Sequence, residues 1–375
     1  MVVVRVSEAN RLLSIHATYC DETATATLLT CENVEMHLSL WKPSGNQEGI
    51  VIEIQRRKGD SITFHRYSRC ILDAVAGDLD ISYHVEKNGQ DIDAVLSRKV
   101  QRTLTLEAQQ DARTEAENAI IAIEIAHGLI MKDRIDANQL GLESLCLLTD
   151  PKKTGLTTAV IASRVVLLGS AQDVNTNKSA PEEALLGDET PFREIRQALL
   201  SLIQFRRIGD GDDFGHGEAS SEESEHITVL HNLALAVLAN ALDVIENDDL
   251  RSSASSAPED VSAGRARLDT SESISDQFLM ESLECSDNRD VMKTLITELG
   301  KAGLKPHNAC LSAKCIGCLC RASEKARKKA EELGAKNVVQ TALEVGTRTH
   351  LKLQRECSKV LSSLTRTRDD DEEEE

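Results

Sequence analysis

The densest group of potential metal ligands in this chain lies on a short stretch near residue 310. Zinc is held by four nitrogen or sulfur ligands in a tetrahedron, and the gap between Cys315 and Cys318 is typical of such sites. However, the sequence has no second pair with this spacing. Successive residues of a helix point about 100° apart, so these cysteines cannot converge on one ion if the stretch is helical. We therefore expect a metal-free helix with no cofactor, in which the cysteines are small core side chains. The residues concerned are His307, Cys310, Cys315, Cys318 and Cys320.

The glycine- and aspartate-rich run Gly209–Gly215 is a second place where chemistry could reside. A calcium loop needs an oxygen ligand where Phe214 stands and a glutamate where Ser221 stands, and a dinucleotide-binding loop needs a preceding strand. The sequence also lacks a phosphate-binding Gly-Lys-Ser/Thr loop, a Gly-x-Ser-x-Gly elbow and a His-Glu-x-x-His motif. We therefore expect this run to be a flexible acidic loop, and we do not expect the protein to be an enzyme.

The overall composition narrows the function classes further. The chain has 375 residues, of which 41% are hydrophobic and 2% aromatic, enough for about two or three domains with an aliphatic core. Its formal net charge of −19 opposes broad contact with a phosphate backbone, so we expect no nucleic-acid partner. Ten cysteines without a secretory signal favour reduced thiols and a cytoplasmic location. The acidic tail at 367–375 is expected to be solvated, with contact to a basic partner as the alternative.

The first 85 residues have the patterning of a small α+β module. Alternating apolar side chains predict three strands, over Leu12–Thr18, Glu35–Trp41 and Ile50–Ile54. Gly59 ends the last strand, Ser61 occupies an N-cap position, and an amphipathic helix follows as far as Gly77. We therefore predict an antiparallel sheet packed by a helix, sharing no core with the rest of the chain.

The end of this module resembles the last strand and last helix of a kinase-associated 1 domain. The resemblance rests on the run from Ile52 to Ser61, followed by Phe64, Tyr67 and Ile71. It implies binding to acidic phospholipid, or autoinhibitory contacts, through a basic cluster. The residues that would form the cluster are Arg56, Arg57, Lys58, Arg66 and Arg69, beside His65. The alternative interpretation is a solvated basic rim on a folding module.

After about residue 98 the sequence is dominated by helical periodicity. Ser323 is predicted to cap a basic helix, Gly334 to break it, and Gly346 to end the helix that follows, with a third helix behind. The junction at 323–339 resembles the one between the first two helices of an armadillo repeat, and three helices in 42 residues match that unit. A shift of 193 residues places Gly141 on Gly334 and predicts a second unit.

The predicted fold is therefore mainly α, an armadillo-like α-solenoid over 98–366 preceded by the α+β module at 1–85. Intermediate repeats are expected to use helices at Phe192–Ile208, Ile227–Asn247, Ser275–Leu299 and Asn308–Ala322. Disordered loops are expected at 171–191, 209–225 and 248–273. The stretch Ile227–Ile245 is apolar, but its asparagine and aspartate side chains are costly in hydrocarbon, so we expect a helix buried in protein and no transmembrane span.

The resemblance to armadillo repeats implies a concave helical surface that binds a protein partner, either acidic or extended. The polar residues expected to bind it are Asn308, Lys314, Arg321, Arg348, Lys352, Arg355 and Lys359. Nuclear-import members of the family use tryptophan in that groove, and the single tryptophan here is Trp41, so basic import signals are not the expected ligand. The leading hypothesis is a non-enzymatic protein-binding scaffold. The alternative is a peripheral-membrane or signalling adaptor that binds acidic phospholipid through the N-terminal module.

Overall fold

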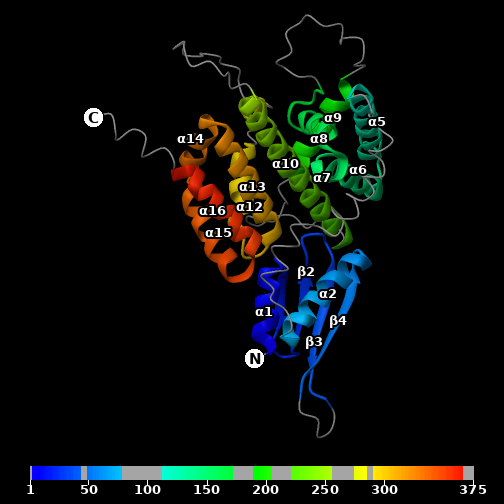
Figure 1. Cartoon of the computed structure of the whole chain (residues 1–375), viewed down its shortest axis with the longest axis vertical. Coiled ribbons are helices and arrows are strands. Elements are labelled where there is room, and N and C mark those ends of the chain that lie inside the picture. The colour runs from blue at the N-terminus through cyan, green and yellow to red at the C-terminus, as the bar shows by residue number, and fades with distance from the viewer. Residues whose placement is uncertain are drawn as a thin grey trace, which may run out of the picture. The chain divides into compact units, whose positions relative to one another are not determined.

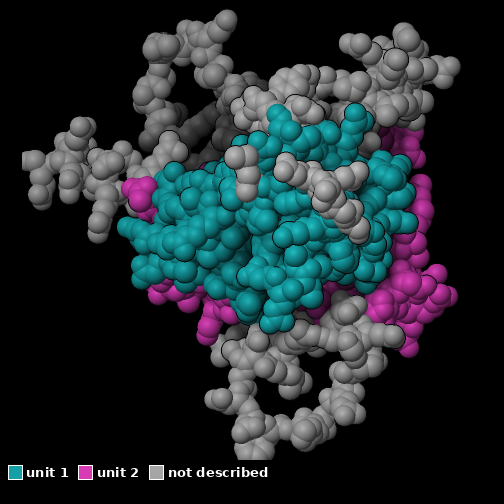
Figure 2. Space-filling view, turned by 90° about the horizontal axis from the view of Figure 1, so that it is seen from below, with its two compact units in different colours: residues 1–101, 298–313, 336–362 teal, residues 102–297, 314–335, 363–375 magenta. Residues whose placement is uncertain are grey.

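The computed structural model describes residues 2–43, 49–77, 112–171, 189–204, 221–255, 274–284 and 290–365. The chain divides into two compact units (Figure 2). Unit 1 contains residues 1–101, 298–313 and 336–362, and unit 2 contains residues 102–297, 314–335 and 363–375. The described part is mainly helical, with a four-stranded antiparallel sheet near its N-terminus, which confirms the coarse fold class.

Unit 1 begins with two helices and a sheet whose strands follow in chain order (Figure 1). The elements are α1 (Val2–Leu12), β1 (His16–Cys20), β2 (Thr25–Leu29), β3 (Glu35–Trp41), β4 (Val51–Lys58) and α2 (Ser61–Ala76). The predicted strand at Leu12–Thr18 is wrong at its start, because Leu12 ends a helix that was not predicted. The β-branched run at Val2–Val4 favours a strand by propensity, and burial of Val6 and Ala9 on the helix outweighs that preference.

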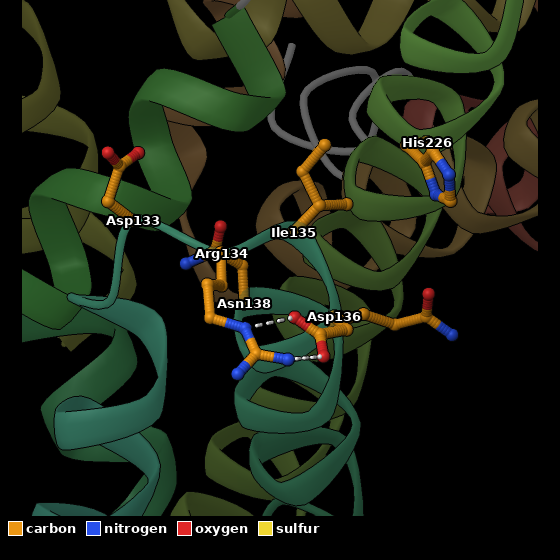
Figure 3. A pocket seen from close by; sticks show the side chains of 7 residues that line it. Asp133, Arg134, Ile135, Asp136, Asn138 and His226 are labelled. Atoms are coloured by element: carbon orange, nitrogen blue, oxygen red, sulfur yellow. Dashed lines mark hydrogen bonds and ion pairs between the residues drawn. The ribbon is translucent and has the colours of Figure 1, made fainter.

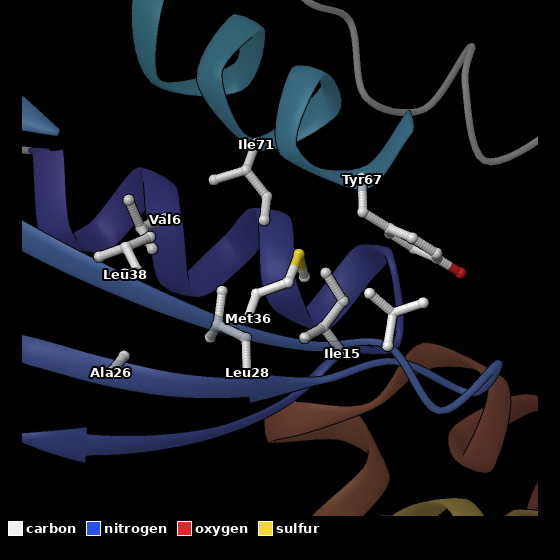
Figure 4. Close-up of a cluster of buried hydrophobic side chains, with 9 residues drawn as sticks. Val6, Ile15, Ala26, Leu28, Met36, Leu38, Tyr67 and Ile71 are labelled. Carbon is white, nitrogen blue, oxygen red and sulfur yellow. The ribbon is translucent and has the colours of Figure 1, made fainter. Parts of the chain in front are cut away.

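The core of this module lies between the sheet and its two helices (Figure 4). Alternate side chains of β2 and β3 point to one face, where Leu28 and Met36 are paired across the strands and fully buried. The buried cluster contains Val6, Ile15, Ala26, Leu28, Val34, Met36, Leu38, Tyr67 and Ile71. Both helices thus contribute to one small aliphatic core, to which Tyr67 adds an aromatic ring.

The turn between β4 and α2 is specified locally by its sequence. Gly59 has φ +95°, and a Cβ atom there would lie 2.8 Å from the Asn33 carbonyl oxygen. Both the backbone conformation and the lack of space therefore require glycine at this position. The predicted N-cap at Ser61 is wrong by one residue, because the Asp60 carboxylate accepts the Thr63 N–H at 2.6 Å. Gly77 ends the helix with φ 87°, as predicted.

Unit 1 is completed by residues of the C-terminal helices. Four of them have residues in both units, namely α12 (Val291–Gly300), α13 (Pro306–Ala322), α15 (Ala335–Thr349) and α16 (Leu351–Thr365). The hydrophobic cluster described for the N-terminal module is formed by residues 2–75, and hydrogen bonds link the module to these helices. The Lys352 N–H donates to Ser14 Oγ at 2.9 Å, and residues 1–101 cluster with 298–313 and 336–362.

The helix boundaries near the C-terminus test three specific predictions. Ser323 Oγ accepts the Ala326 N–H at 3.0 Å and caps α14 (Glu324–Glu332), as predicted. Gly334 has φ +71° between α14 and α15, which confirms the junction. Gly346, however, lies inside α15, so the predicted break is wrong. A Cβ atom on Gly346 would lie 2.6 Å from the backbone nitrogen of Gln354, so this glycine permits a close approach instead.

Unit 2 is an assembly of helices around α8 (Leu156–Leu168), which contacts α5, α6, α7, α9, α10 and α11. The bounds of these helices are α5 (Ala112–Ile130), α6 (Ile135–Leu148), α7 (Pro151–Thr154), α9 (Thr190–Gln204), α10 (Ser221–Ser255) and α11 (Ile274–Glu284). Gly141 lies within α6, where a Cβ atom would be 2.7 Å from Ile130 Cγ1. The predicted equivalence of Gly141 with the junction at Gly334 is therefore wrong, because Gly141 serves the packing of α6 on α5.

The predicted helix at Ile227–Asn247 is confirmed within α10. Over His226–Asp248 this helix is long and apolar enough to cross a membrane by length and composition, and 50% of that window is buried inside the protein. The helix includes residues 221–225 and 248–255, which were assigned to linkers. The remaining parts of the predicted loops, including Gly209–Gly215, and the acidic tail lie outside the described residues, apart from the ends at 171 and 189–191.

Candidate functional site

Three side chains that could act together meet in unit 1, from segments far apart in the sequence. Cys31 lies between β2 and β3, His307 near the start of α13, and His350 immediately before α16. One ligand-type atom of each lies within 4.8 Å of the corresponding atoms of the other two. We call these three residues the Cys–His cluster. Sequence reasoning had singled out His307 but not Cys31 or His350.

The turn that carries Cys31 is held by its own backbone and by Thr30. The Val34 N–H donates to Thr30 Oγ1 at 3.1 Å, and the Thr30 N–H donates to the Val34 carbonyl at 3.1 Å. Asn33 has φ 59°, which closes the turn, and asparagine tolerates this conformation better than most residues. The position of Cys31 therefore follows from a rigid local turn at the end of the sheet.

His350 has a structural role at the N-terminus of α16. Its Nδ1 accepts the Leu353 N–H at 3.1 Å, which is the geometry of an N-cap. Ser14, at φ 58° after α1, accepts the neighbouring Lys352 N–H at 2.9 Å. Two of the amides that begin a helix without intrahelical partners are thus satisfied by side chains, one of them from the N-terminal module.

His307 connects this cap to the sheet. One ring nitrogen, Nε2, lies 2.9 Å from the Leu29 carbonyl oxygen, and the other, Nδ1, lies 2.9 Å from His350 Nε2. The Cys31 Sγ atom is 3.3 Å from the same Nδ1. The rings of His307 and His350 are tilted by 65° with centroids 5.0 Å apart, so they meet edge to face rather than stacking.

The backbone partners at the two ends determine where the protons lie. A carbonyl oxygen only accepts, so His307 Nε2 carries a hydrogen and donates it to Leu29. An amide N–H only donates, so His350 Nδ1 is unprotonated and the neutral ring carries its hydrogen on Nε2. His350 Nε2–H therefore donates to His307 Nδ1. We call this chain of hydrogen bonds, from Leu353 through His350 and His307 to Leu29, the histidine clasp.

The histidine clasp leaves no ring nitrogen free for a metal ion. His350 Nε2 holds a hydrogen, and the lone pair of His307 Nδ1 accepts that hydrogen. Two nitrogens bound tetrahedrally to zinc at about 2.0 Å would be separated by about 3.3 Å, whereas these are 2.9 Å apart, a hydrogen-bond distance. Both ring nitrogens of each histidine thus have a hydrogen-bond partner. The short distances among the three side chains, which resemble those of a metal site, result from these hydrogen bonds.

The surroundings keep the cluster uncharged at neutral pH. Burial lowers the pKa of His350 to about 3, and the neighbouring His307 ring adds to that effect. Burial also lowers the pKa of His307 and of His16, whose ring lies 6.4 Å from that of His307. Burial raises the pKa of the Cys31 thiol, opposed in part by the Lys352 ammonium. Cys31 therefore stays a thiol rather than a nucleophilic thiolate.

Three of the four predicted core cysteines of α13 are buried, and the fourth, Cys310, is partly exposed. Cys315, Cys318 and Cys320 are at most 1% exposed, and α13 is helical throughout. Burial raises the pKa of Cys315 to about 12, so this thiol is protonated at neutral pH. Cys318 also lies near Asp243 and Glu246 of α10, but those carboxylates are bound by Lys314 and Arg321. This second group therefore forms ion pairs within unit 2.

Of the seven residues predicted to bind a protein partner, three are buried or paired with other side chains and four are exposed. Asn308 is 3% exposed, and Lys314 and Arg321 are engaged with α10. The remaining four are exposed and follow one another along the end of α15 and the first turns of α16, namely Arg348, Lys352, Arg355 and Lys359. Lys359 also pairs with Glu356 at 2.7 Å and keeps 59% of its side chain exposed.

The residues predicted to bind phospholipid gather near the β4–α2 turn and are all exposed. Among them, Arg56 donates to the Gly59 carbonyl at 2.7 Å, Arg66 pairs with Glu32 at 3.4 Å, and Arg69 pairs with Asp73 at 3.7 Å. Arg57 and Lys58 are the last residues of β4. Ile62, which was not predicted as part of a site, is 79% exposed in the first turn of α2.

Unit 2 has an open hollow where the α5–α6 turn lies near the start of α10 (Figure 3). It is lined by Asp133, Arg134, Ile135, Asp136, Asn138, Gln139 and His226. Its charged pair, Arg134 and Asp136, is joined at 2.6 Å, with both side chains more than two-thirds exposed (73% and 68%). The hydrogen bond from Arg134 lowers the pKa of the Asp136 carboxyl, so this group stays ionised and paired at neutral pH and is not poised to act as a general acid.

Comparison with known proteins adds no further guide to the site. No protein-family model matches this chain, and neither a curated protein nor a solved structure is significantly similar to it.

Proposed function

We propose that this chain is a non-enzymatic, cytoplasmic scaffold of armadillo-like helical repeats that binds an acidic protein partner. The observation that carries the proposal is the exposed basic row on α15 and α16, formed by Arg348, Lys352, Arg355 and Lys359. Lys352, Arg355 and Lys359 are spaced three and four residues apart, so they share one face of α16. We call these four residues the basic row.

The other face of α16 supports this interpretation. Leu353, Cys357 and Val360 are fully buried, so the helix is anchored by one face and presents Arg355 and Lys359 on the other. The Lys352 ammonium also interacts with Cys31 and Glu32. A row of cations on a rigid helix suits carboxylates of a helical or extended acidic segment. The Ser323 cap of α14 and the Gly334 junction between α14 and α15 support the repeat architecture. An enzyme is not favoured, because the described histidines and cysteines of the Cys–His cluster are already engaged.

A charge-reversal experiment tests this proposal. Arg355→Glu combined with Lys359→Glu should weaken binding of a fluorescent poly-glutamate peptide to the full chain at least about tenfold at low salt. The matched control is Lys132→Glu with Lys152→Glu, two exposed lysines of unit 2, which changes the net charge equally. Equal weakening by both pairs would show a general charge effect and would remove the basic row as the site.

The alternative is a peripheral-membrane or signalling adaptor, favoured by Ile62 together with its basic neighbours. An apolar side chain exposed by 79% can insert among lipid tails, while Arg57 and Lys58 attract anionic headgroups at about 1 kcal/mol each. Co-sedimentation of the full chain with phosphatidylserine vesicles should then fall on Ile62→Ser. The control is Leu304→Ser, which alters a side chain of the same unit that is 78% exposed. No sedimentation of the native chain would eliminate this alternative.

A further inference from the structure

We propose that the histidine clasp is an acid-sensitive joint within unit 1. It holds the start of α13 and the start of α16 on the N-terminal module at neutral pH, and protonation of His307 or His350 opens it. The proposal concerns the internal architecture of the unit and does not depend on what the basic row binds.

The geometry leaves no position for an additional proton. A proton on His350 Nδ1 would face the Leu353 N–H at 3.1 Å, which would cost α16 its cap. A proton on His307 Nδ1 would face the hydrogen of His350 Nε2 at 2.9 Å between the nitrogens. In both cases two donors would point at one another inside the protein. A proton on His307 must therefore break the bond that joins α13 to the residue before α16, and a proton on His350 must break the cap of α16.

Among the charged groups around the clasp, Glu32 favours a proton on His307, but its effect is smaller than the opposing effects of burial and of Lys352. Lys352, from α16, places a positive charge nearby and disfavours a second one. His16, from β1, is a neighbouring base. The carboxylate of Glu32, from the β2–β3 turn, already accepts the Tyr67 hydroxyl at 2.9 Å and faces Arg66 of α2. The Cys31 thiol lies 3.3 Å from His307 Nδ1, and Cys310, which has Glu356 as a charged neighbour, lies next to Cys31.

Opening would affect contacts over a long span of sequence. The clasp joins residues 278 positions apart through Leu29 and His307, and 43 positions apart through His307 and His350. The Lys352 N–H to Ser14 bond lies beside it, so loss of the clasp also frees the first turn of α16 from the N-terminal module. The joint thus couples the protonation of two buried rings to the attachment of α13 and α16.

The size of the effect follows from the rings in the opened state. A free histidine has a pKa of about 6.5, so lowering the pH from 7.5 to 5.0 favours the opened, protonated state by about 30-fold for each ring. If both rings must be neutral in the closed state, the same change of pH favours the opened state by up to about 1000-fold. Amide hydrogen exchange in unit 1, corrected for the intrinsic effect of pH, measures this population directly.

The test compares the native full chain with the double variant His307→Gln, His350→Asn. Glutamine can still donate to Leu29, and asparagine can still cap α16, but neither takes up a proton near pH 5. The native chain should lose protection at 14–36, 304–312 and 346–358 by at least about 30-fold between pH 7.5 and 5.0, and the double variant should lose less than about threefold. His65→Gln, which removes an exposed histidine of the same unit, should behave like the native chain.

Three results would overturn the proposal. The first is unchanged protection of the native chain at pH 5.0. The second is a ring tautomer at pH 7.5 other than Nε2–H for either histidine, read from long-range proton–nitrogen spectra. The third is one zinc ion per chain that is lost in the double variant His307→Gln, His350→Asn, because such an ion would be held by the nitrogens that the clasp uses. If the double variant fails to fold, the tautomer spectra and the native pH series still decide the matter.

Discussion

Gly346→Ala should destabilise unit 1, although alanine is the better helix former. Gly346 lies inside α15, and an added Cβ atom would stand 2.6 Å from the Gln354 nitrogen and 3.0 Å from its Cα. These are backbone atoms, so no side-chain rotation relieves the contact. An ordinary contact begins at 3.4 Å, so α15 and the first turn of α16 must separate by about 0.8 Å.

The magnitude follows from three contributions. Overpacking of this kind costs about 2 kcal/mol. The added Cβ atom also stands against the Gln354 nitrogen, whose N–H donates to the His350 carbonyl at 3.1 Å, and disturbing this bond costs about 1 kcal/mol more. The higher helix propensity of alanine relative to glycine offsets about 1 kcal/mol of this destabilisation. The net expectation is a loss of about 2 kcal/mol in the free energy of unfolding of unit 1.

Gly128→Ala is the matched control for this variant. Gly128 also lies inside a helix, α5, but a Cβ atom there would meet nothing within 4 Å. The control should therefore stabilise its unit by about 1 kcal/mol, from propensity alone. Urea unfolding and native-state hydrogen exchange on both variants measure the difference. Stabilisation of similar size in both variants would refute the close approach of α15 and α16 described above.

Four further predictions follow from individual residues. The pKa of His350 is lowered to about 3 in the folded state, so the stability that its neutral ring contributes is complete above pH 6.5 and is lost as the pH falls. The free energy of unfolding should therefore decrease by about 2 kcal/mol by pH 5.0. Urea midpoints that stay constant over this pH range would contradict the prediction. Gly334→Val should cost about 1–3 kcal/mol because φ is +71°, whereas Gly334→Asn should cost clearly less, as thermal unfolding will show. Elemental analysis of the reduced protein should find no stoichiometric zinc. One zinc ion per chain that is lost on Cys315→Ser would show that the α13 cysteines are metal ligands and not core side chains. Arg321→Ala should cost about 1–2 kcal/mol, since it leaves the Glu246 carboxylate, only 14% exposed, without its cation; a double-mutant cycle with Glu246→Gln should recover most of the coupling.

Local signals in the sequence were sufficient for several elements. Ser323 and Gly334 act within one helical turn, and the glycine-aspartate turn at Gly59 depends on backbone conformation and a short-range cap. The cysteines of α13 follow an apolar stripe, so their burial is implied by their spacing. Such features need only neighbouring residues, which is why they could be predicted without a fold.

Glycines inside helices show where that reasoning fails. From the sequence, Gly141 and Gly346 are predicted to interrupt helices, because an isolated glycine lowers helix propensity. In the structure each lies where another segment comes too close for a Cβ atom. Whether a glycine ends a helix or permits a close approach depends on what lies opposite, and only the tertiary structure contains that information.

The sequence by itself determined the helical character of the C-terminal region, the strand–turn–helix of the N-terminal module and the burial of the α13 cysteines. Only the tertiary structure decided that residues 1–101 join 298–313 and 336–362 in one compact unit, and that His307 meets His350 and Cys31 there. The physical reason is range. Periodicity and capping act over a few residues, whereas the histidine clasp joins groups 43 and 278 positions apart whose pairing has no local signature.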